Sequence, residues 1–127
     1  MGTLKADFTD AVVLVTGGAQ GIGKAVAQAF ARASARVVIA DIDEQAGQEA
    51  SAAPEMEGRA RFVRCDVAVP EEVAALMESI TAHEGRLDVL VNNAGIMISQ
   101  PPDELPVEAW DRVLNVNLRG AFLCVKY

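Results

Sequence analysis

The sequence predicts an α/β domain built on a parallel sheet. Short apolar runs rich in β-branched residues alternate with longer amphipathic segments, which is typical of successive βαβ units. The chain has 127 residues, of which 51% are hydrophobic and 23% charged, so we expect one domain over 1–127 with a substantial core.

Four apolar runs have the length of strands. Three of them lack the alternation of apolar and polar residues that a half-exposed strand would show, as expected for buried parallel strands. The third contains Arg61 and Arg64, which favours a place at the edge of the sheet. The predicted strands cover 11–15, 36–40, 61–65 and 87–91.

Helical periodicity separates these runs. Apolar residues recur at intervals of three or four over 22–33 and 73–80. Pro70, followed by two glutamates, suits the first turn of the third helix. A less regular pattern predicts a helix over 43–53, and a fourth helix is predicted from Pro106 to the C-terminus. The apolar stripe of that fourth helix comprises Trp110, Val113, Leu114, Leu118, Ala121 and Val125.

Charge and cysteine spacing exclude several classes of function. The net charge is −7 and no lysine or arginine cluster is present, which argues against nucleic acid and against an anionic membrane as partners. No apolar run has transmembrane length. Cys65 and Cys124 lie far apart, outside any spacing typical of zinc or redox sites, so we expect no metal site and two reduced, buried thiols in a cytoplasmic protein.

A glycine-rich segment, 16–23, joins the first strand to the first helix. Gly17, Gly21 and Gly23 lie where a tight turn delivers backbone N–H groups to an anion such as a pyrophosphate. The spacing Gly-x-x-x-Gly-x-Gly differs from the standard Rossmann fingerprint but makes the same demand on the backbone. The alternative interpretation is a purely structural turn.

Asp41 follows the second strand, about twenty residues beyond the glycine loop, where a carboxylate can accept hydrogen bonds from ribose hydroxyls. Its charge would repel a 2′-phosphate, and neither Gln20 nor Ile42 supplies a compensating cation. NAD is therefore favoured over NADP. Asp41 could alternatively cap a helix, although Asp43 is better placed for that role.

Polar residues also follow the third and fourth strands. Asp66 and Val67 come after the third run, and Asn92, Asn93, Ala94 and Gly95 come after the fourth. The carboxyl ends of parallel strands form the edge at which such sheets bind ligands. Loop capping is the alternative for each of them, and for Asn92 the two interpretations remain equally open.

Asn117 lies seven residues beyond Trp110, on the apolar stripe of the fourth helix. An unpaired amide is costly on such a face, so we expect a hydrogen-bonding partner or a water. The alternative is that Asn117 tolerates partial exposure to solvent, but the neighbouring Asn115 already serves as the asparagine on the exposed face of the helix.

Taken in order, the segments 16–23, 65–67, 92–95 and 115–118 closely resemble the short-chain dehydrogenase/reductase family over essentially the whole chain. They match the branch with the shorter chain rather than the extended branch that includes sugar-nucleotide epimerases. The resemblance implies a Rossmann-type, doubly wound sheet with strand order 3-2-1-4. It also implies a homo-oligomeric, NAD-dependent oxidoreductase of a secondary alcohol or ketone.

The resemblance also implies roles for individual residues. The glycines would line the pyrophosphate, Asp41 the adenosine ribose, and Asp66 with Val67 the adenine, while 93–95 would support the cofactor side of the sheet. Asn117 matches the catalytic-site asparagine, which in the family kinks its helix and holds a water linked to the catalytic lysine. The expected cofactor-binding residues are Gly17, Gln20, Gly21, Ile22, Gly23, Asp41, Ile42, Asp66, Val67, Asn93, Ala94 and Gly95.

The pattern departs from the family in one respect. Members use a serine and a Tyr-x-x-x-Lys motif from the following half, whereas the only tyrosine is Tyr127, directly after Lys126. We therefore expect an N-terminal half, truncated after the fourth helix and inactive alone. The alternatives are a non-catalytic dinucleotide-binding module or an association partner that uses its open fourth strand and fourth helix.

Overall fold

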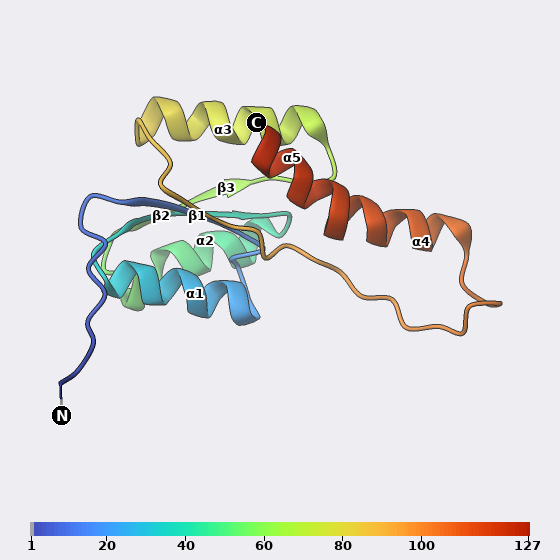
Figure 1. Cartoon of the computed structure of the whole chain (residues 1–127), viewed down its shortest axis with the longest axis horizontal. Helices are drawn as coiled ribbons and strands as arrows, with labels where there is room; N and C mark the ends of the chain where they lie inside the picture. The colour runs from blue at the N-terminus through green and yellow to red at the C-terminus, as the bar shows by residue number, and fades with distance from the viewer. Residues whose placement is uncertain (1) are drawn as a thin grey trace.

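The four apolar runs form a parallel sheet in the computed structural model, which describes residues 2–127 (Figure 1). The strands are β1 (Val12–Thr16), β2 (Arg36–Asp41), β3 (Ala60–Arg64) and β4 (Val89–Val91). Their order is β3-β2-β1-β4, so the strand order and the edge position of the third strand are confirmed. The first three strands lie within one residue of the predicted bounds, whereas β4 begins two residues later than predicted.

The helices predicted between the strands are all present. They are α1 (Gly21–Arg32), α2 (Glu44–Ala52) and α3 (Pro70–His83), and a single 3₁₀ turn, η1 (Pro54–Met56), follows α2. Asp43 caps α2, since its Oδ1 accepts a hydrogen bond of 3.0 Å from Ala46 N–H. Within residues 2–127, none of the helices is long and apolar enough to cross a membrane.

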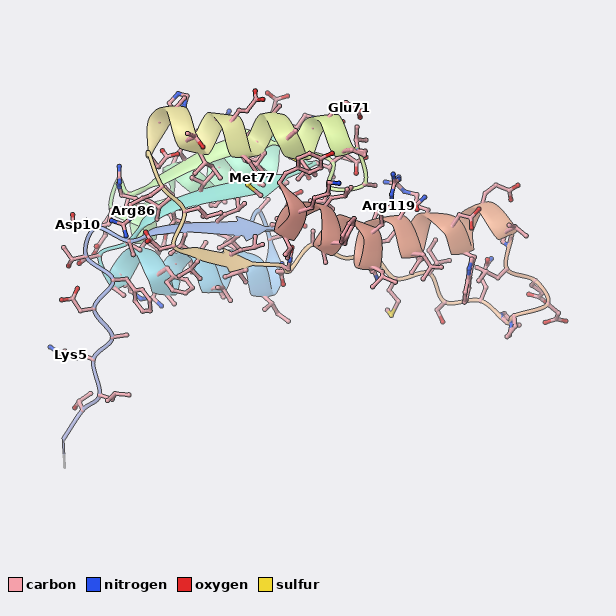
Figure 2. The ribbon with its side chains drawn as sticks, turned by 45° about the horizontal axis from the view of Figure 1, so that its top comes forward. Lys5, Asp10, Glu71, Met77, Arg86 and Arg119 are labelled. Atoms are coloured by element: carbon pink, nitrogen blue, oxygen red, sulfur yellow. The ribbon has the colours of Figure 1, made fainter. Side chains whose placement is uncertain are left out.

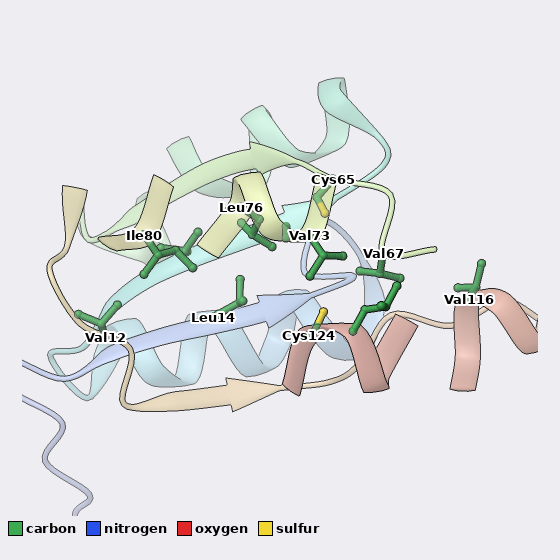
Figure 3. Close-up of a cluster of buried hydrophobic side chains, with 12 residues drawn as sticks. Val12, Leu14, Cys65, Val67, Val73, Leu76, Ile80, Val116 and Cys124 are labelled. Atoms are coloured by element: carbon green, nitrogen blue, oxygen red, sulfur yellow. The ribbon is translucent and has the colours of Figure 1, made fainter. Parts of the chain in front are cut away.

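Helices cover both faces of the sheet, α1 and α2 on one side and α3 with the C-terminal helix on the other (Figure 1). Successive residues of a strand point to opposite faces, so each apolar run feeds two cores. The core beneath α3 contains Val12, Leu14, Val38, Ala40, Val73, Leu76, Ile80 and Cys124 (Figure 3). The opposite core contains Val13, Val15, Val37, Ile39, Ala27, Ala31, Ala50 and Met56. Two-sided burial explains why the central strands show no polar alternation.

Asp88 joins the start of β4 to the start of β1. Its N–H donates to Val12 O at 2.9 Å, and its Oδ2 accepts from Val12 N–H at 2.8 Å. The hydrogen bond from the Arg86 guanidinium, followed by that from Val12, holds the pKa of Asp88 below its usual range. The short strand β4 is thus anchored by a side chain as well as by its ladder.

The C-terminal helix is interrupted, where the sequence predicted one continuous helix. It consists of α4 (Val107–Leu114), a π-helical turn η2 (Asn115–Arg119) and α5 (Gly120–Lys126). Its buried residues are Val116, Gly120, Leu123 and Cys124. The apolar stripe faces outward in large part, with Trp110 55% and Leu118 68% exposed, as expected for a helix that could contact a partner; α4 itself projects beyond the end of the sheet (Figure 1).

Leu76 offers a test of the core beneath α3. We expect Leu76→Ala to lower the free energy of unfolding by about 3 kcal/mol, because truncation of a fully buried leucine leaves a cavity. Leu4→Ala is the matched control, since Leu4 is 99% exposed and its truncation should change stability little. Urea denaturation followed by circular dichroism measures both, and equal effects would contradict the described core.

Candidate functional site

A cleft of about 490 Å³ opens at the carboxyl ends of the strands. This volume lies within the range of about 300–1,000 Å³ that is usual for ligand pockets. The cleft is lined by every cofactor-binding residue predicted from the sequence except Gly23. The residues that complete the lining are Ala40, Cys65, Ile96, Arg112 and Val116. The sheet therefore brings together side chains from four separate loops at one edge.

The glycine loop presents the N-terminus of α1 to the cleft. Gly17 and Gly21 have φ values of +64° and +55°, a region that favours glycine. The N-cap residue Gln20 makes no side-chain capping bond, and the first turn of α1 carries no acidic residue among the residues described. The N–H groups of that turn and the positive end of the helix dipole are suited to an anion.

Gly23 lies behind the loop rather than in the cleft. A Cβ atom at this position would overlap the carbonyl oxygen of Gly17 and would meet Asn93 Nδ2 at 2.5 Å. Gly23 therefore allows α1 to approach the end of β1 closely. Gly23 belongs to the glycine loop as predicted, but it contributes to the packing of α1 and does not line the cleft.

Asp41 connects the end of β2 to the glycine loop. Its Oδ2 accepts a hydrogen bond of 3.1 Å from Ala19 N–H, and its Oδ1 accepts one of 3.0 Å from Asp43 N–H. Helix capping belongs to Asp43, as the spacing suggested. The half-buried carboxylate of Asp41 lines the cleft with further lone pairs that could accept from a ligand.

Thr16 is fully buried at the end of β1 and is a residue to which the sequence assigned no role. Its Oγ1 accepts hydrogen bonds from Asn93 N–H at 3.1 Å and Ala94 N–H at 3.0 Å. Asn93 Nδ2 in turn donates to the carbonyl oxygens of Thr16 and Gly17, both at 3.1 Å. The only sequence signal for Thr16 was a hydroxyl at the end of an otherwise apolar strand.

The contacts of Asn92 favour the structural interpretation of this residue. Its Nδ2 donates to Ala121 O at 3.2 Å and so ties the end of β4 to α5. Asn92 does not line the cleft, whereas Asn93, Ala94 and Gly95 do.

The turn after β3 forms another part of the cleft. Asp66 Oδ1 accepts a hydrogen bond of 3.0 Å from Ala68 N–H, and Asp66 N–H donates to Glu72 Oε1 at 3.1 Å. Val67 is buried beside it. Burial raises the pKa of the neighbouring Cys65 to about 12, so this thiol stays protonated near neutral pH.

Asn117 has the partner that the sequence required. Its Oδ1 accepts from Ile96 N–H at 2.8 Å and its Nδ2 donates to Ile96 O at 2.9 Å, so the amide pairs with this backbone as a neighbouring strand would. Asn117 lies in the π-helical turn, in keeping with the expected kink. It does not line the cleft but holds Ile96, which does.

Arg112 is a cation that the sequence did not single out. It belongs to α4 and lines the cleft, although α4 begins far along the chain from the glycine loop. Helical periodicity alone gives no sign that this residue would face the ends of the strands.

Over residues 2–127, no group of three or more His, Cys, Asp or Glu side chains could hold a metal ion.

A family model described as short chain dehydrogenase matches residues 11–127. The chain belongs to the short-chain dehydrogenase family. The resemblance read from the four sequence motifs is thereby confirmed, and so is the Rossmann-like α/β fold.

Relatives within the short-chain dehydrogenase family include an uncharacterized oxidoreductase of Thermotoga maritima, 44% identical over 91% of this chain and 46% of that protein. A cis-4-hydroxycyclohexanecarboxylate dehydrogenase of Sinomonas cyclohexanicum is 46% identical over 94% of this chain and 49% of that protein. A crystal structure of a short-chain type dehydrogenase/reductase from Mycobacterium marinum superimposes with a TM-score of 0.89 at 35% identity, over 94% of this chain and 49% of that one. The chain spans about half the length of the relatives it matches.

Gly23 and Gly21 provide a test of the loop geometry. We expect Gly23→Ala to lower the free energy of unfolding by about 3 kcal/mol, because its Cβ would overlap the Gly17 carbonyl. Gly21→Ala should cost about 1 kcal/mol, since a positive φ opposes it and, among the described residues outside its chain neighbours and its own helix backbone, no atom lies within 4 Å of the added Cβ. Urea titration compares the two variants, and the reverse ranking would contradict the close approach at Gly23.

Proposed function

We propose that the chain forms the NAD-binding part of an oxidoreductase that acts on a secondary alcohol or a ketone. The observation that carries this proposal is the cleft itself, because the N-terminus of α1 and the Asp41 carboxylate line the same space. When bound, the nicotinamide ring would accept a hydride from the alcohol or donate one to the ketone. Membership of the family and the dehydrogenase names of its relatives support this class of reaction.

The residues present fit the phosphate and ribose portions of a dinucleotide. Gly21 leaves the backbone open to a pyrophosphate, and the N-terminus of α1 supplies N–H donors that the side chain of its N-cap residue does not cap. Asp41 is held by Ala19 and Asp43 and would accept from the ribose hydroxyls.

The remaining cleft residues would receive the two ends of the cofactor. Asp66 and Val67 would meet the adenine, together with Ile42, whose side chain is 48% exposed at the cleft. Residues 93–95 would support the cofactor on the side of β4. We propose that Asn117 acts there indirectly, by fixing Ile96 through both of its amide atoms.

Preference for NAD over NADP rests on Asp41. A carboxylate at the ribose position repels a 2′-phosphate, and neither Gln20 nor Ile42 adds a cation beside it. Arg112 is the cation within the described lining, but it comes from α4 rather than from the loops that flank Asp41. We therefore propose that Arg112 does not offset the charge of Asp41.

Calorimetric titration of the 127-residue chain tests this assignment. We expect Asp41→Asn to weaken NAD binding about ten-fold, because a hydrogen bond to a charged acceptor is lost, and to raise the affinity for NADP relative to NAD. Asp43→Asn is the matched control, since it removes the same charge nearby and asparagine still caps α2. A parent chain that binds no NAD would refute the proposed function, and equal effects of the two variants would refute the role of Asp41.

We further propose that this chain alone captures the cofactor without turnover. Hydride transfer to a carbonyl needs a proton donor, and the titratable cleft residues suit that task poorly. Asp41 and Asp66 accept backbone hydrogen bonds, and the pKa of Cys65 is raised to about 12. A binding module without chemistry is accordingly the second candidate function.

The free, buried cysteines are in keeping with the cytoplasmic location that we propose.

Self-association is the third part of the proposal. Trp110, Leu114, Leu118 and Phe122 are 40–68% exposed along one helical stretch, which forms an apolar face suited to a second copy of the chain. We expect sedimentation velocity to show dimers or larger species at micromolar concentration, and Leu118→Glu to shift them to monomer. A monomeric parent chain would contradict this part of the proposal.

A further inference from the structure

The turn that carries Asp66 is held from outside the cleft by Glu72. This glutamate lies in the first turn of α3, and its Oε1 accepts hydrogen bonds from Asp66 N–H at 3.1 Å and from Arg64 Nη1 at 2.7 Å. One carboxylate oxygen therefore joins the last residue of β3, the turn after it and the start of α3.

The neighbouring residues of the turn are fixed in other ways. Cys65 N–H donates to Asp41 O at 3.0 Å, which continues the pairing of β3 with β2. Val67 is buried against Gly120, where a Cβ atom would come within 2.7 Å of Val67 Cγ2. Asp66 is half-buried between these two anchored residues; its carbonyl oxygen accepts from Val69 N–H at 3.0 Å, and Glu72 holds its N–H.

The side chain of Asp66 is held within the turn itself. Its Oδ1 accepts from Ala68 N–H, and among the residues described no hydrogen bond reaches Oδ2, which leaves that oxygen for a ligand in the cleft. Arg64 matters here because Glu72 and Asp66 carry like charges close together, and the guanidinium offsets their repulsion.

We propose that Glu72 is a positioning residue for recognition of the adenine base. This inference rests on the proposed function, in which Asp66 meets the adenine. A carboxylate accepts a hydrogen bond from the exocyclic amine of adenine. A base that carries a carbonyl in place of this amine would instead bring two acceptors together, which form no hydrogen bond. Glu72 holds the peptide of Asp66 so that its carboxylate meets this amine. It thereby determines selectivity for adenine without touching the cofactor.

The test compares NAD with nicotinamide hypoxanthine dinucleotide, which carries a carbonyl in place of the adenine amine. We expect the parent chain to bind NAD about ten-fold more tightly than this analogue. Glu72→Ala should weaken NAD binding about five-fold and affect the analogue much less, so that the preference falls to about two-fold. Calorimetric titration measures both affinities, and thermal unfolding verifies that each variant is folded.

Two further variants separate positioning from a general effect on α3. Glu71→Ala removes an adjacent acidic residue from the same helical turn, where Glu71 lies exposed at the start of α3 (Figure 2), and should leave the preference unchanged. Glu72→Gln keeps an oxygen that can accept from Asp66 N–H and should retain most of the preference.

Several outcomes would overturn the inference. Equal weakening of NAD and of the analogue by Glu72→Ala would reduce Glu72 to a structural residue. So would a loss of preference in Glu71→Ala that matches the loss in Glu72→Ala. Failure of the parent chain to bind NAD would refute the proposed function itself, and the inference with it.

Discussion

The hydroxyl of Thr16 and the amide of Asn93 join the carboxyl ends of β1 and β4, and the cleft is arranged around this junction. Thr16 Oγ1 accepts from the backbone that enters the 93–95 segment, while Asn93 Nδ2 spans the carbonyls at the start of the glycine loop. Buried polar groups must be paired, so the two loops cannot separate without leaving several such groups unsatisfied.

Side chains from a strand end and from two helices bind the backbone of the loops that form the cleft. Asp41 holds the glycine loop, Glu72 holds the turn at Asp66, and Asn117 holds Ile96. The backbone N–H groups at the start of α1 are an exception, because the side chain of the N-cap residue Gln20 makes no hydrogen bond to them. This contrast makes the N-terminus of α1 the part of the cleft best suited to an anion.

Much of the fold could be predicted because local periodicity and burial agree. The continuous apolar runs at β1 and β2 required cover on both faces, and the two cores supply it. The C-terminal helix was less predictable, because helical periodicity alone does not place a π-helical turn at Asn115–Arg119. The exposure of Trp110 and Leu118 agrees with the association surface expected from their apolar stripe.

The sequence by itself determined the order of the elements, the glycine loop and the polar residues at the strand ends, since these follow from spacing along the chain. Only the tertiary structure showed that Gly23 acts through packing, that Glu72 supports Asp66, and that Arg112 reaches the cleft. Those three relations join residues of separate elements. They depend on how closely helices approach the sheet, a distance that side-chain packing sets and local sequence patterns do not contain.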